Sequence, residues 1–237
     1  MKIGLLGAGG YFYSNIMANT RLGISAIPRD IFDLIDNLDY DVLDEYDCII
    51  NCAALIDQDR AHVDAMYRKE MYQVNAFAPK QIRDNYDGFF IHISSYFILD
   101  GNCNDYSRTK YFAHNILKDC PYTAIIAVAH PFSGCNSNNY WGFLSKNLNT
   151  ELVLDDINKF NIINIKKFVN SLDSVIKEQM TGQIAVYEAG EYTKYSMACK
   201  LFGERKNWKA GVFNDDIAPR PKEVLLSNKK WDTVIEC

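Results

Sequence analysis

The chain has 237 residues, 48% of them hydrophobic and 23% charged, so it can bury a full core as one domain of ordinary size or as a domain with a small appended lobe. Its formal net charge is −5 and it has no basic run, which argues against a nucleic-acid partner. No apolar run reaches the roughly 18 residues that a membrane-spanning helix needs, so no membrane association is expected.

Short apolar runs alternate with helical patterns along the first half of the chain. Strands are predicted at residues 2–6, 24–27, 47–54, 89–94 and 122–129, and helices at about residues 11–19, 59–85 and 106–118. Because the strands are apolar throughout, both faces of their sheet must be covered, which is typical of a parallel sheet with helices on each side. The sequence therefore predicts an α/β fold built on a Rossmann-type, doubly wound parallel sheet.

The pattern weakens after residue 130, where asparagine-rich segments indicate loops and short elements. We expect residues 131–237 to form a mixed segment. It would comprise a small C-terminal substrate lobe and a return to the sheet edge at about residues 184–188.

Cysteine and histidine usage bears on compartment and metal binding. The seven cysteines are odd in number and form no CxxC pair, and the four histidines lack metal-ligand spacing. Neither a disulfide framework nor a metal site is expected, and a reducing, cytoplasmic setting fits. The apolar start of the chain is too short and too broken by glycine for a signal peptide, and indicates a first strand that enters a glycine turn.

A Gly-Ala-Gly-Gly turn at residues 7–10 lies between the first predicted strand and the first predicted helix. In that context, glycines let the backbone turn tightly and approach a pyrophosphate, whose charge meets the helix N-terminus. The third glycine of the usual patterns is replaced by Phe12 or Tyr13, so the helix must shift to pack on the sheet. Residues 1–130 are thus expected to form an NAD(P)-binding Rossmann domain, and a turn that binds nothing is the alternative.

Two charged residues follow the second predicted strand. Arg29 could hold the 2′-phosphate of NADP, although an ordinary surface arginine is the alternative. Asp33 could face the adenine side of the cofactor, or it could serve as the N-cap of a helix.

A serine, a tyrosine and a lysine stand where proton chemistry could occur. Tyr106 and Lys110 are four residues apart on a predicted helix and therefore share one face. Ser95 follows a predicted strand, at the edge where parallel sheets hold ligands. A tyrosine has a pKa of about 10, and a nearby ammonium would stabilise the tyrosinate, so that Tyr106 could exchange protons near neutral pH. Ser95 would orient a substrate oxygen and Lys110 could reach the nicotinamide ribose, whereas the alternative for the Tyr/Lys pair is a helix surface.

Five segments, in order along the chain, resemble motifs of the dTDP-4-dehydrorhamnose reductase branch of the extended short-chain dehydrogenase/reductases. Residues 29–36 resemble R-x-x-L-D-L-T-D, 51–54 resemble N-A-A-A, 74–79 resemble V-N-A-x-A-P, 92–101 resemble H-I-S-T-D-Y-V-F-D-G, and 220–230 resemble the C-terminal R-P-x-x-S-x-L-D-x-x-K. The segments occur in family order and are spread over nearly the whole length of the chain. The resemblance implies the family fold and NADPH-dependent reduction of a ketone.

The resemblance also implies site residues. Ser95 stands at the position of the catalytic threonine, and Tyr106 and Lys110 stand at the catalytic tyrosine and lysine. The expected cofactor contacts are Gly7, Gly9, Gly10, Tyr11, Phe12, Arg29, Asp33, Cys52, Ala53, Ala54, Asn75, Tyr106, Lys110 and His130.

The span from Ser95 to Tyr106 is shorter than in the family and lacks a segment that walls the substrate pocket. Aromatic residues would have to replace that wall, because an aromatic face can pack against a sugar or a base. We therefore expect substrate contacts from Ser95, Tyr96, Tyr140 and Trp141. The alternative for Tyr140 and Trp141 is a place in the core of the small lobe.

The resemblance implies an NAD(P)-dependent oxidoreductase that reduces a nucleotide-linked keto-sugar, or a related epimerase/reductase, with Tyr106 as proton donor. NADP is the expected cofactor and NAD is possible. The alternative is a non-catalytic NAD(P)-binding regulatory protein of the same fold. A dehydratase is disfavoured because no Asp-Glu pair lies beside Ser95. The expected partner is the nucleotide-linked sugar, with neither nucleic acid nor membrane, and a homodimer is possible.

Overall fold

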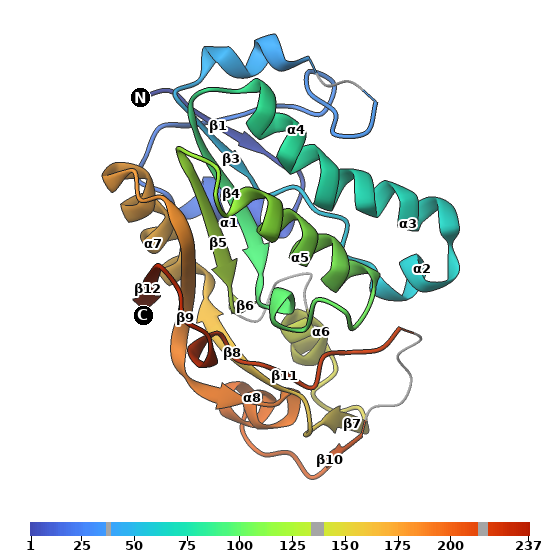
Figure 1. The fold of residues 1–237 in the computed structure, drawn as a ribbon. Coiled ribbons are helices and arrows are strands. Elements are labelled where there is room, and N and C mark those ends of the chain that lie inside the picture. The colour runs from blue at the N-terminus through green and yellow to red at the C-terminus, as the bar shows by residue number, and fades with distance from the viewer. Residues whose placement is uncertain (37–38, 134–139, 213–217) are drawn as a thin grey trace.

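The computed structural model describes residues 1–36, 39–133, 140–212 and 218–237. Figure 1 shows a twisted sheet with helices on both faces and smaller elements gathered at one end of it. The elements of the first half are β1 (Ile3–Leu6), α1 (Tyr11–Asn19), β2 (Ile24–Ala26), β3 (Cys48–Asn51), α2 (Gln58–Val63), α3 (Ala65–Tyr72), α4 (Ala78–Asn85), β4 (Phe89–Ser95), α5 (Asp105–Leu117) and β5 (Thr123–Val128). The elements of the second half are β6 (His130–Phe132), α6 (Tyr140–Lys146), β7 (Leu152–Asp155), β8 (Lys159–Asn164), α7 (Ile165–Glu178), β9 (Gly182–Tyr192), α8 (Lys194–Phe202), β10 (Trp208–Gly211), β11 (Glu223–Val224) and β12 (Thr233–Glu236).

The main sheet has the strand order β11-β8-β9-β5-β4-β3-β1-β2, and its strands run parallel from β2 to β9. The chain leaves β1 for β2 on one side and returns to β3 on the other, which makes the carboxyl end of β1 a topological switch point. Ligands of such sheets bind outside the carboxyl ends of the strands at this point. The predicted doubly wound Rossmann-type sheet is confirmed.

Both faces of the sheet are buried because neighbouring residues of each strand point to opposite sides. In β3, Ile49 joins a core cluster with residues of α4 and α5, whereas Ile50 joins a second cluster with residues of α1 and α7. Figure 1 shows α3, α4 and α5 over one face and α1 and α7 over the other. Continuous apolar strands are the consequence of this double cover.

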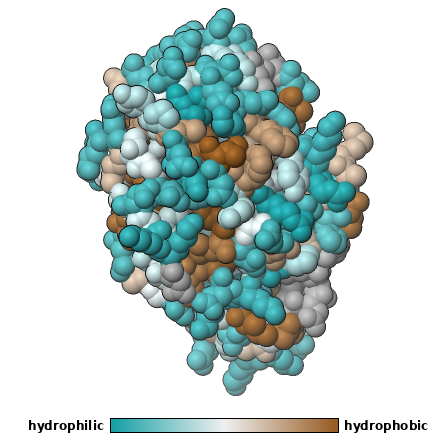
Figure 2. Space-filling model, in the orientation of Figure 1, coloured by the Kyte–Doolittle hydropathy of each residue, from teal (hydrophilic) through white to brown (hydrophobic). Residues whose placement is uncertain are grey.

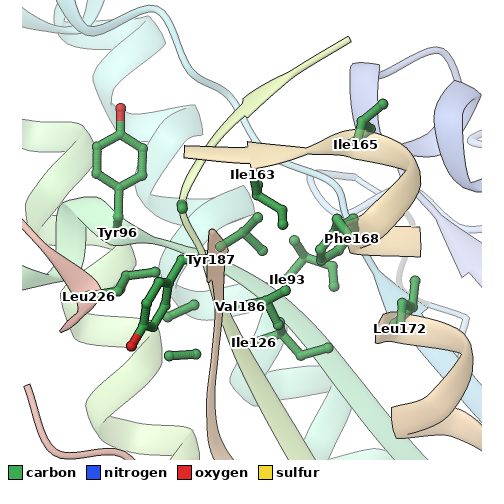
Figure 3. Packing of buried hydrophobic residues seen from close by; sticks show 14 of the residues in the cluster. Ile93, Tyr96, Ile126, Ile163, Ile165, Phe168, Leu172, Val186, Tyr187 and Leu226 are labelled. Carbon is green, nitrogen blue, oxygen red and sulfur yellow. The ribbon is translucent and has the colours of Figure 1, made fainter. Parts of the chain in front are cut away.

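Figure 3 shows how the second core cluster joins the two halves of the chain. Ile93, Ile126 and Val186, from β4, β5 and β9, lie near Phe168 and Leu172 of α7. The segment predicted to return to the sheet edge is therefore an eleven-residue strand, β9, that pairs with β5. It is not itself an edge, because β8 and β12 also pair with it.

The long helix predicted at residues 59–85 is divided in the structure. Asp64 ends α2 and caps α3, since its carboxylate accepts hydrogen bonds from the backbone N–H groups of Met66 and Tyr67 at 3.0 and 3.1 Å. A π-helical stretch, Gln73–Phe77, precedes α4. Pro79 lies in the first turn of α4, and its missing N–H cannot bond the carbonyl one turn earlier, which favours the break there.

No helix within the described ranges is long and apolar enough to cross a membrane. Figure 2 shows hydrophilic residues over most of one face, with hydrophobic areas separated by polar ones where the residues are described. The six cysteines in the described part of the chain are free.

Candidate active site

A cavity of about 1450 Å³ opens at the carboxyl ends of the parallel strands. Pockets for a single small ligand commonly enclose about 300–1,000 Å³, so this cavity has room for a dinucleotide and a second ligand. Its lining extends from the glycine turn after β1, past the ends of β4 and β5, to β8, the start of α8 and the segment before β11.

The glycine turn forms one end of the cavity. Gly7 has φ +102°, and a Cβ atom there would lie 2.7 Å from the backbone nitrogen of Ala53, so only glycine fits. Gly9 also has a positive φ, +83°, and Gly10 precedes α1 as its N-cap. Because Tyr11 and Phe12 line the cavity too, the N-terminus of α1 faces the space where an anionic group would be stabilised.

The aromatic residue in place of the third glycine fills a gap between helices. The ring of Phe12 packs edge-on against that of Phe168 in α7, with 5.2 Å between centroids. Helix α1 therefore rests on α7 through an aromatic contact, and the turn before it stays open.

Arg29 and Asp33 line the cavity beyond the end of β2. Arg29 Nε donates a hydrogen bond to Asp33 Oδ2 at 2.7 Å, and Asp33 Oδ1 accepts one from the backbone N–H of Ile35 at 2.8 Å. Burial would raise the pKa of Asp33, but these hydrogen bonds hold it below its ordinary value. Asp33 thus closes a local turn and does not cap a helix, while the Arg29 side chain stays 71% exposed.

The predicted trio of Ser95, Tyr106 and Lys110 lines the same cavity. Ser95 ends β4, and Asn104 caps α5 so that Tyr106 lies in its first turn and Lys110 one turn later. Lys110 is buried, and its Nζ donates to the carbonyl oxygen of Ile93 at 3.4 Å. Strand end and helix start bring the three side chains together.

The pKa values of the trio differ from expectation. Burial raises the pKa of Tyr106 to about 12, against the opposing effect of a hydrogen bond with Ser95. Burial lowers the pKa of Lys110 to about 8, against the opposing effect of Cys52. The pKa of Tyr106 is therefore raised and not lowered as expected, because desolvation outweighs the hydrogen bond with Ser95. Tyr106 is held protonated at neutral pH, the state that a proton donor needs.

Thirteen of the fourteen predicted cofactor contacts line the cavity, and Asn75 is the exception. The Asn75 side-chain amide is buried and forms two hydrogen bonds with the backbone of Leu55. Its oxygen accepts from the Leu55 N–H at 2.9 Å, and its nitrogen donates to the Leu55 carbonyl at 2.7 Å. Asn75 therefore supports the loop after β3 that carries Cys52, Ala53 and Ala54 into the cavity. The prediction that it contacts cofactor directly is not met by this geometry.

Of the four residues expected to contact substrate, Ser95, Tyr96 and Tyr140 line the cavity, but Trp141 does not. Trp141 is 1% exposed and packs edge-on behind Tyr140 and His130, with ring centroids 4.8 and 5.3 Å apart. It occupies the core position that the sequence left as an alternative, because its side of α6 faces inward.

Several cavity residues from separate segments of the second half were not predicted as site residues. They are Asp155, Asn158, Lys159, Phe160, Lys194, Arg220, Pro221 and Val224. Arg220, Pro221 and Val224 belong to the segment at residues 220–230, which was noted for its family resemblance but was given no role in the site. The others carry no local signal, since a lone lysine or asparagine in a loop-rich segment is usually solvated.

The C-terminal segment lines part of the cavity through Arg220, Pro221 and Val224. Asp59 accepts hydrogen bonds from the backbone N–H of Ala218 and from Arg220 Nη2, both at 2.8 Å. Asn104 Nδ2 donates to the carbonyl oxygen of Pro219 at 2.8 Å. These contacts fasten the segment to the starts of α2 and α5, beside the mouth of the cavity. Within the described ranges, no group of three metal-ligating side chains occurs.

No family model matches this chain, and no curated protein matches it by sequence. Solved structures do resemble it. A dTDP-4-dehydrorhamnose reductase from Clostridium acetobutylicum has 19% sequence identity and a TM-score of 0.82, covering 95% of this chain and 90% of that chain. A dTDP-4-dehydrorhamnose reductase from Bacillus anthracis, solved in complex with NADP, has 17% sequence identity and a TM-score of 0.83, covering 95% of this chain and 90% of that chain.

A more distant likeness is the dTDP-glucose 4,6-dehydratase from Streptomyces venezuelae, solved with NAD bound. It has 12% identity and a TM-score of 0.72, covering 95% of this chain and 88% of that chain. At these identities the likenesses establish the fold. This chain has the Rossmann-type α/β fold of the dTDP-4-dehydrorhamnose reductases.

Proposed function

We propose that this protein is an NAD(P)H-dependent reductase that acts on the keto group of a nucleotide-linked sugar. One observation carries the proposal: Ser95, Tyr106 and Lys110 line the same cavity as the glycine turn. A dinucleotide laid from that turn along the strand ends would reach the trio. The neighbours of the same fold include reductases of such sugars, one of them in complex with NADP.

The cofactor end of the cavity fits a dinucleotide. A Cβ atom at Gly7 would collide with the Ala53 backbone, so the turn holds the bare backbone that a pyrophosphate approaches. Arg29 supports NADP over NAD, because a guanidinium pairs strongly with a phosphate. Its ion pair with Asp33 keeps a carboxylate at the same place, so NAD stays possible. When bound, the reduced cofactor supplies the hydride.

The trio would complete the reduction. Tyr106, protonated at neutral pH, donates its proton to the carbonyl oxygen as negative charge develops there. Ser95 holds that oxygen by a hydrogen bond. Lys110 is mostly charged below its pKa of about 8 and stabilises the developing charge in a desolvated site.

The other end of the cavity suits an anionic ligand that carries rings. Tyr140 and Phe160 offer aromatic faces, and Lys159, Lys194 and Arg220 offer positive charge. These properties match a sugar linked to a nucleoside diphosphate. We further propose a cytoplasmic location, supported by the free cysteines of the described ranges. The division at residue 130 and a homodimer remain predictions.

The test is the loss of NADPH absorbance with a panel of dTDP- and UDP-linked 4-keto sugars. Tyr106→Phe is expected to lower kcat at least 100-fold, in line with the roughly 10²–10⁴-fold contribution of general acids, and to leave NADPH binding unchanged. The matched control is Tyr111→Phe, which removes an exposed hydroxyl from the same helix. If the native protein binds NADPH but turns over none of the sugars, the non-catalytic regulatory alternative is supported instead.

A further inference from the structure

A tyrosine–histidine pair lies at the substrate end of the cavity. Tyr96, directly after β4, has its hydroxyl oxygen 2.8 Å from Nδ1 of His130, the first residue of β6. The His130 ring is also packed edge-on against Trp141, at 5.3 Å between centroids, and lies tilted against Phe160 at 5.0 Å. The imidazole is therefore held in one orientation, with one nitrogen engaged by Tyr96.

The pair is neutral, which limits the imidazole to a single N–H. Burial lowers the pKa of His130 to about 3, and the positive charge of Lys194 adds to the effect. Burial also raises the pKa of Tyr96, which keeps its proton. A phenol is a stronger acid than a neutral imidazole N–H, and an imidazole nitrogen is a stronger base than a phenol oxygen. The Tyr96 hydroxyl therefore donates to Nδ1, and the imidazole proton lies on Nε2.

We propose that Tyr96 locks His130 in its Nε2–H tautomer, so that His130 donates a hydrogen bond to an acceptor oxygen of the nucleotide-linked sugar. The inference rests on the proposed function for the identity of the ligand. Nε2 has no hydrogen-bond partner among the described residues, and His130 lines the cavity.

The neighbours of His130 indicate which ligand it meets. Phe160, which contacts the His130 ring, comes from β8, and Lys194 begins α8. Tyr140 packs against Trp141, the residue that contacts the His130 ring edge-on. Phe160, Lys194 and Tyr140 line the cavity together with His130, and all three come from segments far in sequence from the glycine turn. This placement assigns His130 to the sugar nucleotide, and not to the cofactor contact that the sequence suggested. Tyr96 is a positioning residue in this arrangement, since it acts through the imidazole.

The lock is tested without any ligand. Long-range ¹H–¹⁵N correlation spectra of the full chain labelled with ¹⁵N-histidine distinguish the two neutral tautomers, and His130→Gln identifies the His130 signals among the four histidines. The Nε2–H pattern is expected in the native protein. Tyr96→Phe is expected to shift it toward a mixture with Nδ1–H. The matched control, Tyr187→Phe, removes a hydroxyl from an equally buried tyrosine that does not line the cavity, and should leave the pattern unchanged.

The ligand contact is tested by titration with dTDP-glucose, which lacks the reactive ketone, and separately with NADPH. His130→Phe should weaken dTDP-glucose binding about tenfold, the size expected for one hydrogen bond, with NADPH affinity changed less than about twofold. His130→Gln keeps an N–H donor at similar reach and should retain most of the dTDP-glucose affinity.

Three results would overturn the inference: an Nδ1–H pattern in the native protein, an unchanged pattern in Tyr96→Phe, or a His130→Phe variant that loses NADPH affinity and keeps dTDP-glucose affinity. Failure of the proposed function has a different signature. In that case the native protein binds no dTDP-glucose, while the tautomer spectra still decide for or against the lock.

Discussion

Lys110 is a buried cation, and its replacement by methionine separates its effect on stability from its role in the site. Burial lowers its pKa from 10.5 to about 8, which corresponds to about 3 kcal/mol of unfavourable free energy for the charged form in the folded protein. Lys110→Met removes this penalty and keeps a flexible side chain of similar length. It also leaves the Ile93 carbonyl without its long hydrogen bond, at a cost of about 1 kcal/mol. The net expectation near pH 7 is a gain of about 2 kcal/mol.

The gain should depend on pH in a defined direction. Because the folded pKa of Lys110 lies below its unfolded value, the unfolded chain binds more protons between about pH 8 and pH 10.5. The native protein therefore gains stability as pH rises through this window, and the advantage of the variant disappears there. Above the window the lost hydrogen bond should leave the variant slightly less stable.

Urea unfolding of both proteins at about pH 7 and about pH 10 measures the two free energies of unfolding. Lys118→Met is the control, because Lys118 is exposed at the end of the same helix and its removal should change stability by less than about 0.5 kcal/mol. A Lys110→Met variant destabilised by more than about 1 kcal/mol near pH 7, or a difference equal at both pH values, would refute the reasoning. Turnover should fall in the stabilised variant, as is common when a strained site is relieved.

Three further variants test other parts of the site. Gly7→Ala should weaken NADPH binding more than tenfold and destabilise the fold by about 1–3 kcal/mol, because its Cβ atom would lie 2.7 Å from the Ala53 backbone nitrogen. The control, Gly23→Ala, places its Cβ in open space and should change neither NADPH affinity in fluorescence titration nor stability in urea unfolding. Arg29→Ala should weaken NADPH binding by about 1.5–3 kcal/mol and leave NADH binding unchanged, and equal losses for both would assign Arg29 a structural role. Trp141→Ala should lower the free energy of unfolding by about 3–5 kcal/mol. Phe143, on the same helix, is 50% exposed, so Phe143→Ala should lower it far less. A Trp141→Ala variant with native stability and a raised KM would show instead that Trp141 contacts the substrate.

Local patterns in the sequence were sufficient for the cofactor half of this protein. The apolar strands, the glycine turn and the four-residue spacing of Tyr106 and Lys110 each depend on neighbours in the chain, and the structure places all of them at one sheet edge. The family resemblance added the loop after β3 and supported Ser95, which the end of a predicted strand had already indicated. The single helix predicted at residues 59–85 is divided at Asp64 and near Pro79. Both signals are local, but the prediction gave more weight to the apolar periodicity.

Direction of side chains was the point at which sequence reasoning failed. Asn75 stands in a motif-like segment, but its amide turns to the Leu55 backbone instead of the cavity. Trp141 and Tyr140 are adjacent on α6, so one faces the core and the other the cavity, and composition cannot say which. The pKa of Tyr106 likewise depends on how much protein surrounds the ring, which spacing to Lys110 does not reveal.

The sequence by itself determined the parallel sheet, the glycine turn and the Ser-Tyr-Lys trio, because these arise from periodicity and from contacts within one helix or strand end. Only the tertiary structure decided which residues of the second half line the cavity. Asp59 and Arg220 meet across 161 positions, and His130 and Tyr96 meet across 34. Such contacts form when separate strands and helices pack into one core, so their partners depend on the whole fold and leave no local signal in the chain.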